Sequence, residues 1–500
     1  MENFLSLITG LSISLQPYNL LIIFIGIILG IIVGVLPGLG GANGVAILIS
    51  VAVILPPIPG MILLSTIYWG ALYGGSICSI LFNIPGEPWA VAVTFDGYPM
   101  AKSGRAGRAL VLSFFSHGVG AFLGLLMLSF FAPIIAEFSL KFGPAETFSV
   151  MFLTFSAFVG LGGKSPVKTV IAIFLGFILA AVGLDIVSGK LRLTFGSINL
   201  MGGFNFIVAV IGLFGLGEIF FTVEEGLRME GIKARVGLKD IWEGLKEVFR
   251  YPKALIMGSF IGCWMGLKPG GATPASFMAY GFVKQASKNQ DEFGKGAPAG
   301  IIAPEAAAHG AGTSAALPMI TLGIPGSPTM AVIMGGLMIF GLLPGPMLFK
   351  EHPDFVWGFI GSAWVANFVG LLLILAFAPL FAAILRIRFS IFMPAIVYVC
   401  AIGAYAVNNR MIDVYYMIFF GIVGYLFKKL DYPIAPMVLA LVLGDMAESA
   451  MRQALIMSHG NPLIFFRPPI ALPLMIAGLI IFFWPTISGW KKKLTAKKVV

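Results

Sequence analysis

Runs of apolar residues long enough to cross a lipid bilayer recur along the whole chain. A spanning helix needs about 20 mostly apolar residues. Such runs occupy 19–36, 110–135, 147–163, 167–187, 205–223, 355–385, 391–407, 411–427 and 470–488. Only 11% of the residues are charged, against about 25% in soluble domains. We therefore expect an all-α polytopic integral membrane protein in contact with the lipid bilayer. A soluble enzyme, a nucleic-acid-binding protein and a disordered regulator are excluded.

Clusters of basic residues indicate the orientation in the membrane, because cytoplasmic loops are rich in Lys and Arg. Residues 1–18 carry no basic residue. The clusters are Lys102, Arg105 and Arg108; Lys164 and Lys168; seven residues in 224–253; Arg386 and Arg388; Lys428 and Lys429; and Lys491, Lys492, Lys493, Lys497 and Lys498. All fall inside if the N-terminus lies outside and the C-terminus is cytoplasmic. This predicts a multi-pass protein of the cell membrane.

One long polar connection divides the chain near its middle. Residues 224–253 hold 13 of the 54 Lys, Arg, Asp and Glu residues. Within it, Leu238, Trp242, Leu245 and Phe249 follow helical spacing, which predicts an amphipathic helix on the cytoplasmic membrane face. A docking surface for a regulatory partner is the alternative. The predicted organisation is a first transmembrane repeat at 1–223, this linker at 224–253, and a second repeat at 254–500.

Two further apolar stretches, 44–96 and 254–349, are interrupted by Gly and Pro every few residues. We expect short, broken or re-entrant helices there. Similar motifs occur in both halves in the same order: a Pro-Gly break at Pro37 and again at Pro269, then Ile-Pro-Gly at Pro85 and again at Pro325. The offsets are 232 and 240 residues. The first motif follows a span that starts outside, and its counterpart follows the cytoplasmic linker, so the two repeats are predicted to have inverted topology.

Inverted repeats with interrupted helices are typical of secondary transporters, which bind substrate near the membrane midplane. A helix that restarts after glycines directs free N–H groups and its positive dipole end into a cavity, where they favour an anion. A packing kink or a close helix crossing is the alternative for any single motif. The predicted substrate-binding residues are Pro37, Gly38, Gly40, Gly41, Asn43, Lys268, Pro269, Gly270, Gly271, Thr273, Pro274 and Ser276.

The motifs resemble those of the large membrane subunit of the tripartite tricarboxylate transporter family. The resemblance rests on Gly34-x-x-Pro37-Gly38-x-Gly40, Tyr73-Gly-Gly-Ser76-Ile-Cys-Ser79, Asn83-Ile-Pro85-Gly86-Glu87, Asp96-Gly-Tyr-Pro-Met100, Gly271-Ala-Thr-Pro-Ala-Ser-Phe277, Ala303-Pro-Glu-Ala306, Leu322-Gly-Ile-Pro-Gly326 and Gly341-Leu-x-Pro-Gly-Pro346. It implies an importer of carboxylates, of the tricarboxylate or dicarboxylate class, driven by an ion gradient. It also implies two partners: an extracytoplasmic solute-binding protein and a small membrane subunit.

Ionisable residues within apolar stretches are functional hypotheses, because charges are costly inside a membrane. Glu305 and His309 lie four residues apart and should share one side of a short helix. They either bind a coupling ion or proton, or form a structural hydrogen-bonded pair. Lys268 either neutralises a substrate carboxylate or extends to the outer surface. Glu87 is a further candidate of this kind.

Other acidic residues are expected to be structural. We predict that Asp96 lies at the membrane interface with a role in a turn, and that Asp185 and Glu218 are solvated at span ends. Asp445 and Glu448 share a helix face with Arg452 and are expected to form an ion pair.

The coupling cation is predicted to be Na⁺ or H⁺, with no other cofactor and no metal cluster. Sodium prefers oxygen ligands, and hydroxyl and carbonyl groups cluster in the matching segments of both halves. The predicted ion-coupling residues are Ser76, Ser79, Asn83, Pro85, Gly86, Glu305, His309, Thr313, Ser314, Thr321, Pro325 and Gly326.

Two other functional classes are possible. An intramembrane enzyme needs a metal site or a nucleophile, but the four histidines form no His-Glu-x-x-His motif and the three cysteines lie far apart. An ion channel would not need two inverted helix breaks. The sequence therefore favours a transporter over an enzyme or a channel.

Overall fold

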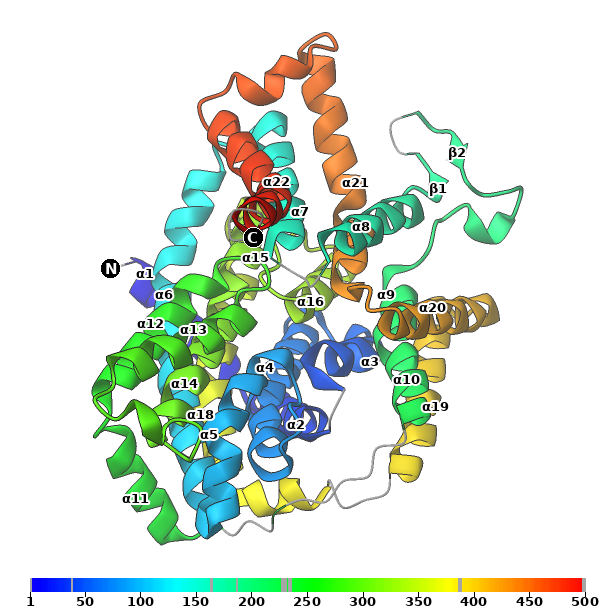
Figure 1. Ribbon diagram of the computed structural model, residues 1–500. Coiled ribbons are helices and arrows are strands. Elements are labelled where there is room, and N and C mark those ends of the chain that lie inside the picture. Colours follow the sequence, from blue (N-terminus) through cyan, green and yellow to red (C-terminus); the bar gives the residue numbers. More distant parts are fainter. Residues whose placement is uncertain are drawn as a thin grey trace.

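The computed structural model is a bundle of helices with one small β-hairpin (Figure 1). It describes residues 2–36, 39–161, 165–185, 188–225, 232, 236–384 and 389–496. Seven helices within the described residues are long and apolar enough to cross a membrane. An all-α polytopic membrane protein is thereby confirmed.

The first half contains ten helices before the polar linker. They are α1 (Glu2–Ser14), α2 (Pro17–Val35), α3 (Gly40–Ile54), α4 (Pro57–Phe82), α5 (Val91–Met100), α6 (Ala106–Ser139), α7 (Pro144–Leu161), α8 (Pro166–Ala180), α9 (Phe206–Val210) and α10 (Gly217–Glu225). A short π-helical segment, 211–216, joins α9 to α10. The hairpin of β1 (Gly183–Leu184) and β2 (Leu191–Arg192) follows α8.

The linker helix α11 (Leu238–Val248) leads into the second half. The remaining helices are α12 (Pro252–Gly266), α13 (Ala272–Ala286), α14 (Pro298–Ser314), α15 (Ala316–Leu322), α16 (Pro328–Ile339), α17 (Pro346–Glu351), α18 (Pro353–Ile384), α19 (Phe389–Asn408), α20 (Met411–Lys429), α21 (Ile434–Met457) and α22 (Ala471–Ala496). The predicted amphipathic linker helix is present as α11, with Leu238 and Trp242 exposed.

Proline sets many of the helix starts. Its fixed φ and missing N–H suit the first helical position, where the N–H has no partner within the helix. Helices α2, α4, α8, α12, α14 and α16 all begin at a proline. Most predicted apolar runs therefore match helices to within a few residues.

Three predictions about the spans were wrong. The run 167–187 is not one helix: α8 ends at Ala180, and Gly183, at a φ of +116°, begins the hairpin. Helix α4 is continuous over 26 residues, although Gly and Pro are frequent in 44–96. Helix α21 was not among the predicted spans, although it is long and apolar enough to cross a membrane.

Glycines allow two pairs of helices to approach closely. In α2, Gly26, Gly30 and Gly34 face α4, and a Cβ at Gly30 or Gly34 would clash with the carbonyl groups of Ile67 and Ala71. In α12, a row with the same spacing faces α14: Gly258, Gly262 and Gly266 lie against the backbone of Ala303, Ala307 and Ala311. Small residues at this spacing permit close backbone packing in membranes.

Buried acidic residues join distant segments, in contrast to two of the predictions. Asp185 and Glu218 are buried and ion-paired, with Arg452 at 3.0 Å and with Lys428. Both were wrongly expected to be solvated; helix packing supplies a partner for each charge. The ion pair expected on α21 forms between Glu448 and Arg452, at 2.5 Å. Asp445 forms no ion pair among the described residues.

Asp96 is fully buried within the protein, and its place at the depth of the membrane interface stays a prediction. Its Oδ1 accepts hydrogen bonds from the backbone N–H groups of Gly294, Gly296 and Ala297, each at 2.8 Å. Tyr280 Oη donates to the other oxygen at 3.0 Å. The predicted role in a turn is confirmed, but the turn is the one that precedes α14.

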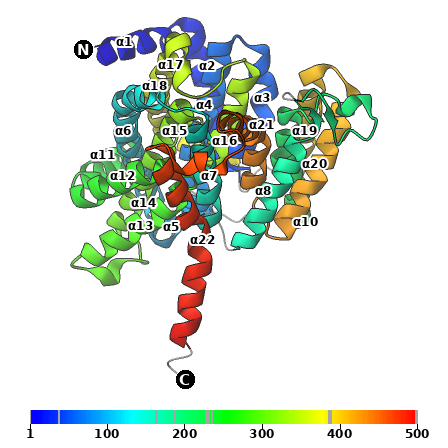
Figure 2. The same ribbon diagram turned by 90° about the horizontal axis from the view of Figure 1, so that it is seen from above.

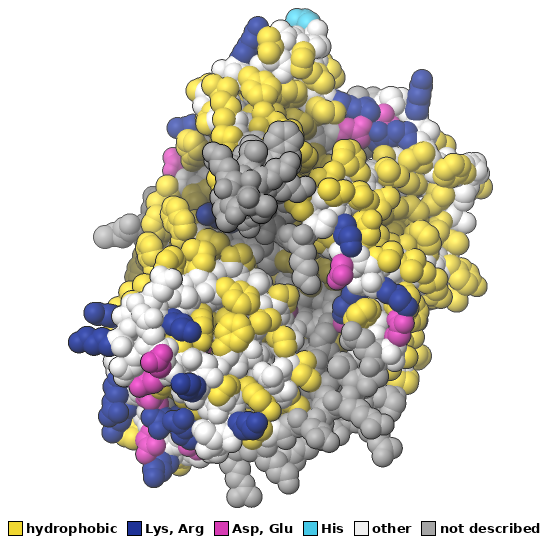
Figure 3. Space-filling view, viewed as in Figure 1, with side chains coloured by type: hydrophobic (Ala, Val, Ile, Leu, Met, Phe, Trp, Pro, Cys, Tyr) yellow, Lys and Arg dark blue, Asp and Glu magenta, His cyan; other side chains and the backbone are white. Residues whose placement is uncertain are grey.

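The surface is largely apolar. In Figure 3 hydrophobic side chains cover much of the visible face, and charged side chains gather at the lower left, where Figure 1 places α11 and α13. Viewed from above in Figure 2, α1 and α17 lie at one end of the molecule and the C-terminus at the other.

Candidate functional site

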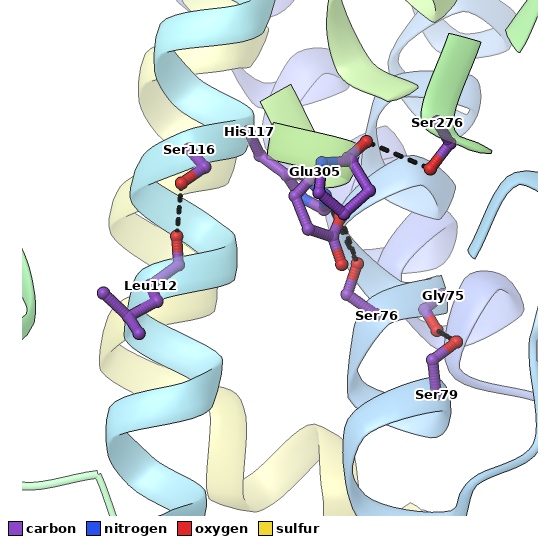
Figure 4. Close-up of polar contacts among 9 residues, drawn as sticks. Gly75, Ser76, Ser79, Leu112, Ser116, His117, Ser276 and Glu305 are labelled. Atoms are coloured by element: carbon purple, nitrogen blue, oxygen red, sulfur yellow. Dashed lines mark hydrogen bonds and ion pairs between the residues drawn. The ribbon is translucent and has the colours of Figure 1, made fainter. Parts of the chain in front are cut away.

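A cluster of buried polar side chains lies where α4, α6 and α14 meet. Ser76 comes from α4, His117 from α6 and Glu305 from α14, and all three are at most 1% exposed (Figure 4). Ser76 Oγ donates a hydrogen bond to Glu305 Oε2 at 3.1 Å. His117 Nε2 is paired with the same carboxylate oxygen and lies 3.3 Å from Ser76 Oγ. The cluster therefore joins the two halves of the chain.

Aromatic rings enclose this cluster. The imidazole of His309, one turn after Glu305, stacks on that of His117 with ring centroids 3.9 Å apart and an interplanar angle of 25°. Tyr73 packs against His309 at 4.6 Å between centroids. Its hydroxyl donates to Asn367 Oδ1 at 2.7 Å. The site is buried, packed and lined by groups that can exchange protons.

Several atoms of the cluster have no hydrogen-bond partner within the described residues. They are Nδ1 of His117, Oε1 of Glu305 and both ring nitrogens of His309. Buried polar groups are normally paired, so orphaned ones need an explanation such as a function or a bound ion. A carboxylate with one free oxygen and adjacent imidazoles can hold a proton or a small cation.

The first helix break is partly filled by the protein's own carboxylate. Gly40, at a φ of +55°, precedes the first turn of α3, and Gly41 N donates to Glu87 Oε1 at 2.5 Å. Glu87 thus takes the place at the helix start that an anion would prefer. Asn43, in the same turn, hydrogen-bonds to Glu218, which pairs with Lys428. Pro37 and Gly38 lie outside the described residues.

The second break has different neighbours. Gly270, at a φ of +74°, donates its N–H to the carbonyl of Gly326 at 2.9 Å. Gly271 N donates to Lys268 O at 3.0 Å. Ser276 Oγ donates to the Pro304 carbonyl at 3.2 Å, which joins α13 to α14. Thr273 and Pro274 are half-buried in the first turn of α13.

A cavity of about 480 Å³ adjoins the second break. Lys268 and Pro269 form part of its wall, and the rest comes from α7, α15 and α22. The first break contributes none of the residues that line it. The structure therefore places the two predicted halves of the substrate site against different neighbours.

The other predicted ion-coupling residues lie in the matching turns that end α4 and α15. Asn83 and Gly323 end these helices in the left-handed region, at φ of 57° and 68°. Gly86 packs against the Gly34 carbonyl, and Gly326 packs against the Gly266 carbonyl. Pro85 is exposed in the first turn, whereas Pro325 is buried in the second.

The hydroxyls predicted to bind a cation mostly donate to their own helices. Ser79 donates to the Gly75 carbonyl at 2.9 Å, Ser314 to Ala311 at 3.4 Å and Thr321 to Leu317 at 2.8 Å. Thr313 is buried, and its hydroxyl has no partner among the described residues. Each oxygen keeps lone pairs that could bind a cation.

His117 was not predicted from the sequence. It lies within an apolar 34-residue helix, and a single histidine there gives no local motif. Its rarity is the one signal that could have found it, since the chain has only four histidines. In the described part of the chain, no group of three or more His, Cys, Asp or Glu residues is arranged so that it could hold a metal ion.

Comparisons with known proteins agree with the membrane architecture. Residues 20–439 match the family described as the tripartite tricarboxylate transporter TctA family. A protein of Agrobacterium vitis, "Uncharacterized 52.8 kDa protein in TAR-I ttuC' 3'region", is 36% identical over 489 residues, covering 97% of each chain. A second A. vitis protein, "Uncharacterized protein in TAR-II ttuC' 3'region", is 39% identical over 233 residues, 46% of this chain and 96% of that one. No solved structure matches.

Proposed function

Because the chain belongs to the tripartite tricarboxylate transporter TctA family, we propose that it imports carboxylates using the energy of an ion gradient. Membership in this family supports a role as a transporter component, and the proposed function is therefore transport. The observation that carries ion coupling is the buried cluster of Ser76, His117 and Glu305. A carboxylate buried between helices of both halves can bind a cation whose arrival changes how those halves pack.

The coupling cation in this proposal is Na⁺ or H⁺. The free oxygen of Glu305 and the adjacent hydroxyl of Ser76 support a small cation that prefers oxygen ligands. The unpaired nitrogens of His117 and His309 support a proton equally well. Both cations place their positive charge at Glu305.

The two halves are proposed to be inverted repeats that form the transport pathway between them. Three parallels support this. Both α2 and α12 carry a row of glycines, and Asn83 and Gly323 end their helices in the left-handed region. In addition, Gly86 packs against α2 as Gly326 packs against α12. Transporters built this way move one repeat against the other around the bound substrate.

The proposed orientation has the N-terminus outside and the C-terminus in the cytoplasm. The distribution of basic residues supports it. In this orientation the outer end of the molecule receives substrate from an extracytoplasmic solute-binding protein. A small membrane subunit completes the proposed tripartite assembly, in keeping with the family.

Uptake of labelled carboxylates tests this function. Cells that carry the complete system should accumulate a labelled carboxylate, and accumulation should stop when ionophores collapse the Na⁺ or H⁺ gradient. Glu305→Gln should lose gradient dependence, while Glu292→Gln, at an exposed position, serves as the matched control. Accumulation that is insensitive to both gradients would contradict ion coupling, and equilibration without accumulation would indicate a channel.

A further inference from the structure

The cavity beside the second helix break has mostly apolar walls, which do not suit a ligand with several negative charges. Its lining is Leu153, Thr154, Ala157, Leu267, Lys268, Pro269, Pro318, Leu322, Ile324, Ile480, Ile481 and Trp484. These residues come from α7, α15, α22 and the segments that directly follow α12 and α15. Figure 1 shows α7, α15 and α22 close together above the centre of the view. The volume of about 480 Å³ lies within the range of about 300–1,000 Å³ that is typical of small-molecule pockets.

Lys268 is the single charged residue in this lining. It forms no ion pair with any carboxylate of the described residues, whereas Arg192, Lys428 and Arg452 are each paired. Lys268 is exposed at the rim of the cavity. An ammonium without a counter-charge beside an apolar surface favours an anion whose apolar part packs on that surface. The other polar side chain, Thr154, already donates its hydroxyl to the Val150 carbonyl at 2.9 Å.

We propose that this cavity binds a monocarboxylate with an apolar body, such as an aryl- or alkyl-substituted carboxylate. Lys268 Nζ pairs with the single carboxylate, and the apolar body packs against Leu153, Ala157, Ile480 and Trp484. A second or third carboxylate would lie against hydrocarbon without a partner, which is costly. This inference rests on the proposed function in one respect, since it identifies the ligand as a transported carboxylate.

The first helix break is a poor alternative for the same anion. Glu87 already accepts the N–H of Gly41 there, and Glu218 lies beside Asn43. Lys428, the partner of Glu218, is already paired with that carboxylate. An anion that approached α3 would meet two carboxylates, whereas one that approaches Lys268 meets a free cation.

Binding to the purified full-length protein in detergent tests the ligand class by calorimetry. The probes are 3-phenylpropanoate, its neutral amide and citrate. We expect 3-phenylpropanoate to bind at least tenfold more tightly than either of the others, since only it matches both the cation and the apolar walls. Citrate binding as tight as or tighter than that of 3-phenylpropanoate would overturn the proposal.

Two substitutions locate the ligand. Lys268→Gln should weaken 3-phenylpropanoate at least tenfold, and Lys284→Gln, on the same helical hairpin but outside the cavity lining, should leave it unchanged. Ala157→Phe fills the apolar part of the cavity and should also weaken the binding of 3-phenylpropanoate. Lys268→Gln removes no ion pair, so it is not expected to prevent folding. Wild-type affinity in both cavity variants would overturn the proposal.

The binding experiment on the cavity and the uptake experiment on transport can fail independently of each other. If 3-phenylpropanoate binds in a Lys268-dependent way but no carboxylate is accumulated by cells, the inferred site stands and the proposed function fails. If citrate is accumulated and 3-phenylpropanoate neither binds nor competes, the function stands and this inference fails. A phospholipid that co-purifies, resists displacement by 3-phenylpropanoate and persists in Lys268→Gln would also overturn it.

Discussion

Glu305 places a carboxyl group in the contact between α4, α6 and α14, where its neighbours are Ser76 and His117. Hydrogen bonds to a charged group contribute about 1.5–3 kcal/mol each. Glu305→Gln keeps the shape of the side chain and removes the charge. It should weaken cation binding about 10–100-fold in assays of uptake against cation concentration, with little change in protein yield.

One result would assign Glu305 a purely structural role. An unchanged cation dependence of uptake, combined with a lower melting temperature, would show that the carboxylate only holds the helices together. His117→Gln tests the same cluster at a second residue, because it removes the titratable imidazole and retains an amide that can form hydrogen bonds.

Asp96 illustrates a residue whose role is stability. It accepts three backbone N–H groups of the segment before α14, all at 2.8 Å, and is fully buried. Asp96→Ala should lower the free energy of unfolding by about 2 kcal/mol or more, since buried donors lose a charged acceptor. Thermal unfolding in detergent measures this.

Asp291 provides the matched control, because it is exposed in the same connection between α13 and α14. Asp291→Ala should leave the melting temperature within about a degree or two of the wild type, as expected for an exposed site that contributes below about 0.5 kcal/mol. Equal destabilisation by both substitutions would contradict the specific role of Asp96.

At the scale of elements, the two glycine rows decide how closely α2 approaches α4 and α12 approaches α14. A Cβ at Gly30 or Gly262 would overlap a backbone carbonyl of the facing helix. Gly30→Val and Gly262→Val should therefore each destabilise the protein by about 1–3 kcal/mol, the usual cost of overpacking. Gly281→Val is the control, because a Cβ there meets no atom within 4 Å.

These substitutions also test the relation between the two halves. If the halves are repeats, Gly30→Val and Gly262→Val should lower the melting temperature by similar amounts and both reduce uptake. A large effect in one half with none in the other would argue that the glycine rows have unrelated roles.

At the scale of the whole molecule, inverted repeats predict on which side of the membrane particular residues lie. Figure 2 places α1 and α17 at the same end. With the native cysteines all buried, single cysteines can be labelled on a low background. Asn3→Cys and Glu351→Cys should react with an impermeant maleimide from outside intact cells, and Ser103→Cys only after permeabilisation. Labelling of positions 103 and 351 from the same side would contradict inverted repeats.

Much of the architecture could be predicted from local sequence. Apolar runs of bilayer length indicate helices, and prolines at their first positions fix where α2, α4 and α12 begin. The Pro-Gly breaks and the Ile-Pro-Gly turns mark interruptions that the structure contains. The prediction missed α21, where charged residues interrupt the apolar run and the structure pairs two of them, Glu448 and Arg452.

The sequence by itself determined the class of the protein, because helix length, apolarity and helix ends depend on residues close together in the chain. Only the tertiary structure decided which buried polar groups meet. Glu305 pairs with His117 across 188 residues, and Glu87 caps Gly41 across 46. Such pairs form because a buried charge must find a partner, and helix packing alone determines which partner is within reach.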